Sequence, residues 1–183
     1  MIYWENTELQ IRSMIKEDIP SFTEAFLEMG WTPKPEIHER YLKEQAEGKR
    51  YIFVAQYKGQ AAGYATLLPL ACDGPYKECY PEVVDFNVWE KFRRHGIGNH
   101  ILDAAENFAA SFSDHICLGV GLYSGYGSAQ RMYVKRGYIP DGSGIWWNQK
   151  PLPPYADCCN DDDLVLFLAK ELRKAYTLLS ASF

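Results

Sequence analysis

The chain has 183 residues, of which 47% are hydrophobic and 23% charged, a composition typical of one globular domain with a substantial core. Its net charge of −5 argues against nucleic acid as a standing partner, because phosphate binding needs a basic face. No stretch approaches the roughly 18 apolar residues of a membrane span, so we expect no membrane association and, by default, a cytoplasmic location.

The first half of the chain predicts a strand, two helices and a hairpin. Residues 8–14 alternate apolar and polar side chains, as a half-buried strand does. Residues 19–29 and 36–47 predict helices, the first after an acidic start and the second ending at a glycine. Residues 51–57 and 61–68 predict two strands joined by a tight turn.

The second half continues as strands alternating with helices. Residues 96–112 carry an apolar stripe at helical spacing, and residues 141–160 form a glycine- and proline-rich insertion. The other expected elements are strands at 82–88, 115–122, 138–139 and 164–169 and a short helix at 128–136. This order implies a mixed sheet with helices on both faces, within a single domain spanning residues 1–183.

Cysteines and histidines predict no metal centre. The five cysteines are odd in number and lack paired metal-ligand spacing, so we expect reduced thiols and no metal. We expect His38, His100 and His115 on the surface or on helix faces.

The loop Arg93-Arg94-His95-Gly96-Ile97-Gly98 separates a β-branched strand from the amphipathic helix. Two glycines and a turn at such a junction can leave several backbone N–H groups pointing one way, beside the positive end of the helix dipole. These features predict a pyrophosphate cradle, to which arginine side chains add positive charge. The loop is neither a P-loop nor a dinucleotide fingerprint, and taken alone it could be a plain turn.

Farther along, Ala129, Tyr133 and Gly137 recur at four-residue intervals, so Ala129 and Tyr133 share one helix face. A small residue there allows close approach beside the phenol. The alternative is a core tyrosine whose hydroxyl is satisfied within the protein.

Arg93-x-x-Gly96-x-Gly98 followed by the Ala129/Tyr133/Gly137 array resembles the GNAT superfamily of acetyl-CoA-dependent N-acyltransferases. The resemblance covers nearly the whole chain. It implies an α/β (α+β) fold, with a mixed, mostly antiparallel six- to seven-stranded sheet flanked by about four helices. It also implies acetyl-CoA as co-substrate.

The resemblance implies a role for each matching residue. The loop residues would bind the coenzyme A pyrophosphate through backbone amides: Arg93, Arg94, His95, Gly96, Ile97 and Gly98. The preceding strand segment would pair with the pantetheine arm: Phe86, Asn87 and Val88. Tyr133 would protonate the departing thiolate. Many members carry an asparagine where this chain has Tyr126, so Ser128 or Ser124 would have to replace that contact.

Two carboxylates on the central strand are candidates for the base that deprotonates the acceptor amine. Glu82 and Asp85 are three residues apart, so their side chains point to opposite faces of a regular strand unless a bulge rotates it. The family shows acids at both positions, and we favour Glu82.

These observations predict an N-acetyltransferase that transfers an acetyl group to a primary amine by direct transfer in a ternary complex. The acidic charge and the aromatic content, 15% of residues, favour a small-molecule amine. Alternatives are a non-catalytic acyl-CoA sensor, motivated by Tyr126, and a transferase for protein or tRNA amines. The aromatic loops make a homodimer plausible.

Overall fold

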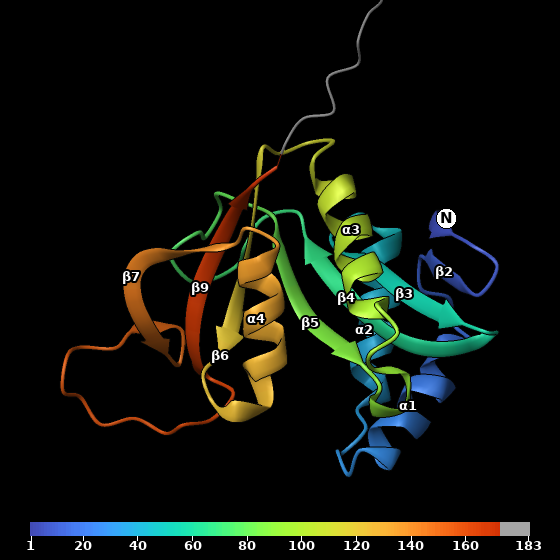
Figure 1. Cartoon of the computed structure of the whole chain (residues 1–183), viewed down its shortest axis with the longest axis horizontal. Helices are drawn as coiled ribbons and strands as arrows, with labels where there is room; N and C mark the ends of the chain where they lie inside the picture. The colour runs from blue at the N-terminus through green and yellow to red at the C-terminus, as the bar shows by residue number, and fades with distance from the viewer. Residues whose placement is uncertain (173–183) are drawn as a thin grey trace, which may run out of the picture.

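One nine-stranded sheet runs through the molecule, with helices on both of its faces (Figure 1). The computed structural model describes residues 1–172, so the end of the predicted domain, residues 173–183, lies outside the described residues. The strands are β1 (Ile2–Glu5), β2 (Leu9–Arg12), β3 (Tyr51–Tyr57), β4 (Gln60–Leu68), β5 (Glu82–Val88), β6 (His115–Gly121), β7 (Ile139–Trp147), β8 (Lys150–Pro151) and β9 (Leu164–Glu171). The helices are α1 (Asp18–Glu28), α2 (Pro35–Ala46), α3 (Ile97–Ala109) and α4 (Gly127–Lys135), with short 3-10 turns at Glu90–Phe92 and Ser124–Tyr126.

The sheet order is β1-β2-β3-β4-β5-β6-β9-β7-β8, and every neighbouring pair is antiparallel except β5 and β6. The predicted mixed, mostly antiparallel α/β architecture with four α-helices is therefore confirmed. The strand count is higher than the predicted six to seven, because β1 and β8 extend the two edges of the sheet. Within residues 1–172, no helix is long and apolar enough to cross a membrane.

The predicted insertion over residues 141–160 begins as part of the sheet. β7 continues to Trp147 and turns back into β8, and its pairing with β9 changes register between Pro140 and Ile145. Gly142 and Gly144 both have positive φ in that interval, so they accommodate the irregularity that lets the strand continue.

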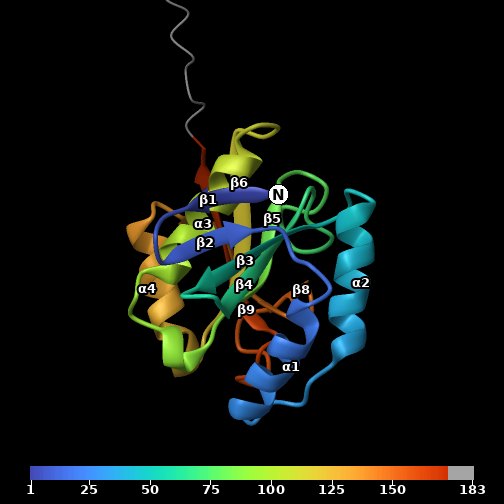
Figure 2. The ribbon, with the colours of Figure 1, turned by 90° about the vertical axis from the view of Figure 1, so that its right-hand side faces the viewer.

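Two helix layers sandwich the sheet, with α3 and α4 on one face and α1 and α2 on the other (Figure 2). The apolar stripe of α3 is buried against β2–β6 and includes Ile97, Ile101, Leu102, Ala105 and Ala109. Truncating a fully buried leucine such as Leu102 to alanine removes about 2–5 kcal/mol in comparable cores, so this stripe fixes where α3 begins.

The parallel pair β5 and β6 separates after two residues. The strands pair only at Glu82 with Cys117 and at Val83 with Leu118, whereas β6 stays paired with β9 along its whole length. Figure 1 shows β5 and β6 together at their upper ends and apart below, where α3 and α4 both begin. Within residues 1–172, the β6-facing edge of residues 84–88 therefore has no strand partner, and it lies near two helix N-termini.

Candidate active site

The loop before α3 exposes a run of unpaired backbone donors. The N–H groups of residues 94–98 donate to no atom of the described chain, and no side chain caps α3. Arg94 and Gly96 have φ of +67° and +75°, which turns successive amides toward one side. A Cβ on Gly96 would meet no atom within 4 Å, so the space beside these donors is open. The geometry is that of an anion site at a helix N-terminus.

The side chains of the loop divide into anchors and free groups. Ile97 is buried in the core, and a Cβ on Gly98 would lie 3.3 Å from the Phe86 ring, so α3 lies close against β5 here. Arg93 is an anchor as well, because its Nε donates to the Val88 carbonyl at 3.1 Å and its own N–H donates to Glu90. The backbone amide of Arg93 is thus occupied, unlike those of the five residues that follow it.

Two loop side chains remain near the donors. Arg94 is exposed and pairs with no group of the described chain. His95 uses Nδ1 against the carbonyls of Phe92 and Arg93, at 3.2 and 3.0 Å, which leaves Nε2 outward. Arg94 is therefore the cation best placed to neutralise a bound phosphate group.

The unpaired edge of β5 can bind an extended amide-bearing arm. Trp89 donates its N–H to Ala62 on β4, so strand alternation directs the backbone groups of Phe86 and Val88 toward the β6 side. The Val88 carbonyl accepts a hydrogen bond from Nε of Arg93, which agrees with this direction. Asn87 pairs with Tyr64 on β4, and its side-chain amide donates to Asp85 at 3.0 Å. The unpaired loop amides and the unpaired edge of β5 lie next to each other along the chain. Together they match the pyrophosphate and the pantetheine arm of coenzyme A.

Tyr133 lies on α4, on the same face of the sheet as the cradle. Its side chain is 6% exposed and packs edge-to-face against Tyr138, with ring centroids 5.8 Å apart. Burial raises the pKa of the Tyr133 phenol, so it stays protonated at neutral pH. Its hydroxyl makes no hydrogen bond within the described chain, which does not support the alternative of a satisfied core tyrosine.

Tyr126, at the position where the resemblance predicts asparagine, has its own partners. Its hydroxyl donates to Asp162 at 2.8 Å, as does the hydroxyl of Tyr123. Its ring covers Gly121, where a Cβ would approach within 2.3 Å. Ser128, in the first turn of α4, is exposed and remains the candidate for a compensating contact.

A bulge places Glu82 and Asp85 on the same face of β5. Asp85 has φ of +50°, and the β4–β5 pairing changes register between Tyr64 and Thr66. Val83 and Phe86 consequently both pack toward α3, although they are three residues apart. Glu82, Val84 and Asp85 lie on the α1–α2 face of the sheet, opposite Tyr133.

Glu82 is a buried carboxyl group with an altered acidity. Its side chain is 8% exposed and accepts no hydrogen bond from the described chain. Burial raises its pKa to about 7, with a further contribution from Asp73, while Arg50 acts in the opposite direction. A carboxylate that titrates near neutral pH is well matched to general base catalysis.

Asp85 is instead held in a buried hydrogen-bond network. Its two oxygens accept hydrogen bonds from the Tyr64 hydroxyl, at 2.7 Å, and from Asn87. The Tyr64 hydroxyl also lies 3.2 Å from Nε2 of His38 on α2. His38 is 2% exposed, so of the two predicted locations it takes a helix face and not the surface, and burial lowers its pKa. These contacts make Asp85 an anchor of the bulge.

Tyr64→Phe should destabilise the fold by about 1–3 kcal/mol, because Asp85 loses a buried donor. Tyr57→Phe is the matched control, since the Tyr57 hydroxyl donates to Glu8 at the surface, at 3.3 Å. Denaturant unfolding measures both variants. Equal stabilities would show that the Tyr64 hydroxyl contributes nothing to the network.

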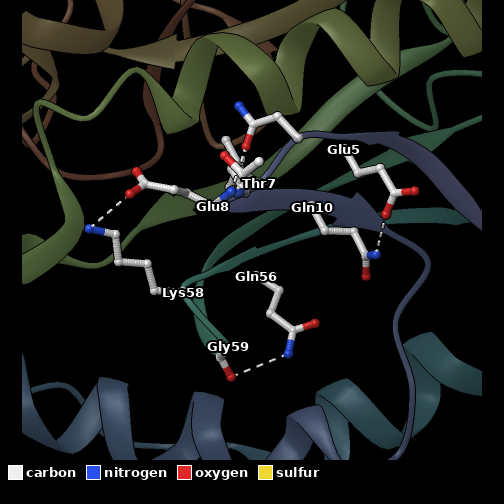
Figure 3. Close-up of a pocket in the computed structure, with 9 residues that line it drawn as sticks. Glu5, Thr7, Glu8, Gln10, Gln56, Lys58 and Gly59 are labelled. Atoms are coloured by element: carbon white, nitrogen blue, oxygen red, sulfur yellow. Dashed lines mark hydrogen bonds and ion pairs between the residues drawn. The ribbon is translucent and has the colours of Figure 1, made fainter.

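Neither a metal cluster nor the hollow beside the β1–β2 turn provides an alternative site in the described chain. Among residues 1–172, no group of three or more His, Cys, Asp or Glu side chains is placed to hold a metal ion. Figure 3 shows a hollow beside the β1–β2 turn, lined by polar side chains that already pair with one another. In it Lys58 contacts Glu8 at 3.2 Å, and Gln10 donates to Glu5 at 2.8 Å. No predicted site residue lines this hollow.

The cradle of unpaired amides, the free strand edge, and Tyr133 and Glu82 on opposite faces of the sheet are the arrangement expected of a coenzyme A-dependent acyltransferase. The Acetyltransferase (GNAT) family model matches residues 11–138, so the chain belongs to that family. It is an acyltransferase that uses acetyl-CoA, as its family membership indicates. No curated protein sequence matched the chain.

Solved structures share the fold at low sequence identity. The Salmonella typhimurium acetyltransferase that modifies the N-terminal serine of ribosomal protein L7/L12 superposes with a TM-score of 0.70 and 12% identity, covering 94% of this chain and 100% of that one. Ard1 from Thermoplasma volcanium gives 0.66 and 19% identity, covering 91% and 99%. YncA from Salmonella typhimurium, solved with its cofactor acetyl-CoA, gives 0.66 and 15% identity, covering 93% and 97%.

Proposed function

We propose that this protein transfers an acetyl group from acetyl-CoA directly to the primary amine of a small molecule. In this proposal Glu82 accepts the proton of the amine and Tyr133 protonates the departing thiolate. The observation that carries it is the placement of the two groups on opposite faces of the sheet where β5 and β6 separate. An amine and a thioester could approach each other there from the two sides.

The acidities of the two residues suit these roles. Bound acetyl-CoA supplies the thioester carbonyl and the thiolate leaving group. An alkyl ammonium has a pKa of about 10.4, so at pH 7 the acceptor must lose a proton before it can attack. The raised pKa of Glu82, about 7, makes it a stronger base than an ordinary carboxylate. Burial raises the pKa of Tyr133 and keeps its proton available.

The strand edge can stabilise the charge that develops on the carbonyl oxygen. Backbone N–H groups of Phe86 and Val88 face the β6 side and have no strand partner within residues 1–172. A fixed amide donor at such a position favours the tetrahedral transition state. Direct transfer in a ternary complex therefore requires no covalent enzyme intermediate.

A small-molecule acceptor is supported by the surroundings of Glu82. The carboxylates of Glu82 and Asp73 lie near each other. Two neighbouring acidic groups suit a cationic amine. The alternative is a protein N-terminal amine, the group modified by the L7/L12 acetyltransferase. Screening amines and peptides with detection of the free thiol decides between them, and turnover on peptides alone would refute the small-molecule version.

Gly96→Glu should abolish the thermal stabilisation produced by acetyl-CoA. The substitution places a negative side chain in the open space beside the unpaired amides. In the native protein, ligand at about 100 times its Kd should add roughly 2.7 kcal/mol to the free energy of unfolding. Thermal melts with and without acetyl-CoA measure the effect.

Gly96→Ala is the control for backbone strain. A methyl group there meets no atom within 4 Å, so only the left-handed conformation, φ +75°, is penalised. This variant should lose about 1 kcal/mol of stability yet still be stabilised by acetyl-CoA. An undiminished ligand shift in Gly96→Glu would place the coenzyme elsewhere.

A further inference from the structure

We infer that the loop between β4 and β5, residues 69–81, is a positioning element for Glu82, held against β9 by the contact of Gly74 with Phe167 so that it excludes water from the Glu82 carboxylate. The inference rests on the proposed role of Glu82 as the base. It adds residues outside the predicted site, on a loop whose sequence shows no catalytic motif.

A phenylalanine ring connects the loop to the sheet. A Cβ on Gly74 would lie 2.6 Å from Cζ of Phe167, so only glycine allows the backbone to come this close. The ring also lies close to Gly119 of β6, where a Cβ would be 3.3 Å from Cε1 of Phe167. The Phe167 ring thus lies against two glycines, one on the loop and one on the strand. Gly74 also has φ of +76°, which other residues rarely adopt.

The two ends of the loop are fixed by backbone hydrogen bonds. Ala71 donates to Tyr80 at 2.8 Å and accepts from Glu78 at 2.9 Å, and its side chain is buried. Pro81 accepts a hydrogen bond from Cys117, the β6 residue paired with Glu82. Figure 1 shows the loop extending across β6 to β9, and Figure 2 shows it on the α2 side of the sheet. The loop therefore lies on the face that carries Glu82.

The groups around Glu82 predict what happens when the loop is lifted. Burial is the largest cause of its raised pKa, and Asp73 on the loop adds to it, so moving the loop weakens both. Arg50, which immediately precedes β3, lowers the pKa and is anchored independently, by Thr66 at 2.8 Å and Glu44 at 2.6 Å. Among the described residues, the Cys117 thiol on β6 also interacts with Glu82, and Cys79 on the loop interacts with Cys117. Lifting the loop should therefore lower the pKa of Glu82.

Gly74→Ala tests the inference, because its methyl group must displace either the loop or the Phe167 ring. Glu82 is titrated by NMR of protein labelled with ¹³C at the glutamate carboxyl groups, with Glu82→Gln assigning the signal. We expect the midpoint to fall from about 7 by about one pH unit. The acid limb of the kcat/KM profile should move by the same amount, with KM for acetyl-CoA unchanged.

Three further variants separate the contact from general damage. Gly59→Ala places a residue at φ +81° with nothing within 4 Å, so it should leave the Glu82 midpoint in place. Phe167→Leu removes the ring without adding a clash and should lower the midpoint even if Gly74→Ala fails to fold. The double variant Gly74→Ala/Phe167→Leu makes room for the methyl group and should be more stable than Gly74→Ala.

Each outcome bears on one hypothesis. An unchanged Glu82 midpoint in folded Gly74→Ala or Phe167→Leu overturns the role of the loop. A lowered midpoint with an unmoved acid limb supports that role but shows that Glu82 is not the base, which refutes the proposed function. Movement of both together supports the inference and the proposed function.

Discussion

Tyr133→Phe should lower turnover by about 10²- to 10⁴-fold while coenzyme A binding is retained. The substitution removes only the hydroxyl, which has no hydrogen-bond partner in the described chain, so little stability should be lost. The ring contact with Tyr138 remains. Steady-state kcat from thiol release, together with calorimetric titration of coenzyme A, measures the two effects separately.

Tyr138→Phe is the matched control for Tyr133→Phe. Tyr138 is the ring neighbour of Tyr133 and is also buried, but its hydroxyl is sealed from solvent. This variant should therefore keep its turnover. Full activity of Tyr133→Phe would require another proton donor. If no acceptor supports turnover in the native protein while coenzyme A binds tightly, the result supports the alternative of a non-catalytic acyl-CoA sensor.

Local patterns in the sequence predict most of the fold. The strands β2–β6 and β9 and the four helices have side-chain periodicities that report which face is buried, whereas β7 was predicted only at its start, residues 138–139. β1 and β8 were missed because β8 has only two residues, and β1, Ile-Tyr-Trp-Glu, lacks the apolar and polar alternation of the equally short β2. Each of them pairs with the strand next to it in the chain, β1 with β2 and β8 with β7.

The phosphate cradle and Tyr133 were also recognisable locally, because glycine positions and helical spacing are visible in the sequence. The sequence allows a bulge at Asp85 but does not require one, because aspartate tolerates positive φ without needing it. The Asp85 network joins residues 21 and 26 positions apart, on three different elements. The burial of Glu82 depends on the contact of Gly74 with Phe167, which no local pattern reports.

Glu82→Gln should abolish most of the activity and yet stabilise the protein above neutral pH. Loss of a general base lowers turnover by about 10²- to 10⁴-fold. The gain in stability follows because the native protein keeps a carboxylate where burial disfavours its charge. Thiol-release kinetics and denaturant unfolding at several pH values measure the two effects.

The pH dependence of that stability has a definite sign. The pKa of Glu82 is about 7 in the folded protein, against 4.5 for an unperturbed glutamate. Between these values the native state binds more protons than the unfolded state, so the Glu82 contribution to stability falls as the pH rises from about 4.5 to 7. At pH 8 the full penalty, at most about 3 kcal/mol, is present, and glutamine should recover about 1–3 kcal/mol of it.

At pH 4.5 and below, Glu82→Gln and the native protein should differ little in stability, because glutamate is then neutral in the folded state. Glu24→Gln, on the exposed face of α1, should change neither activity nor the pH dependence. A stability difference that does not depend on pH would show that Glu82 is not desolvated in solution. A pH-dependent stability gain with full activity would instead leave Glu82 buried as described but assign the base to another group, with solvent water the simplest candidate.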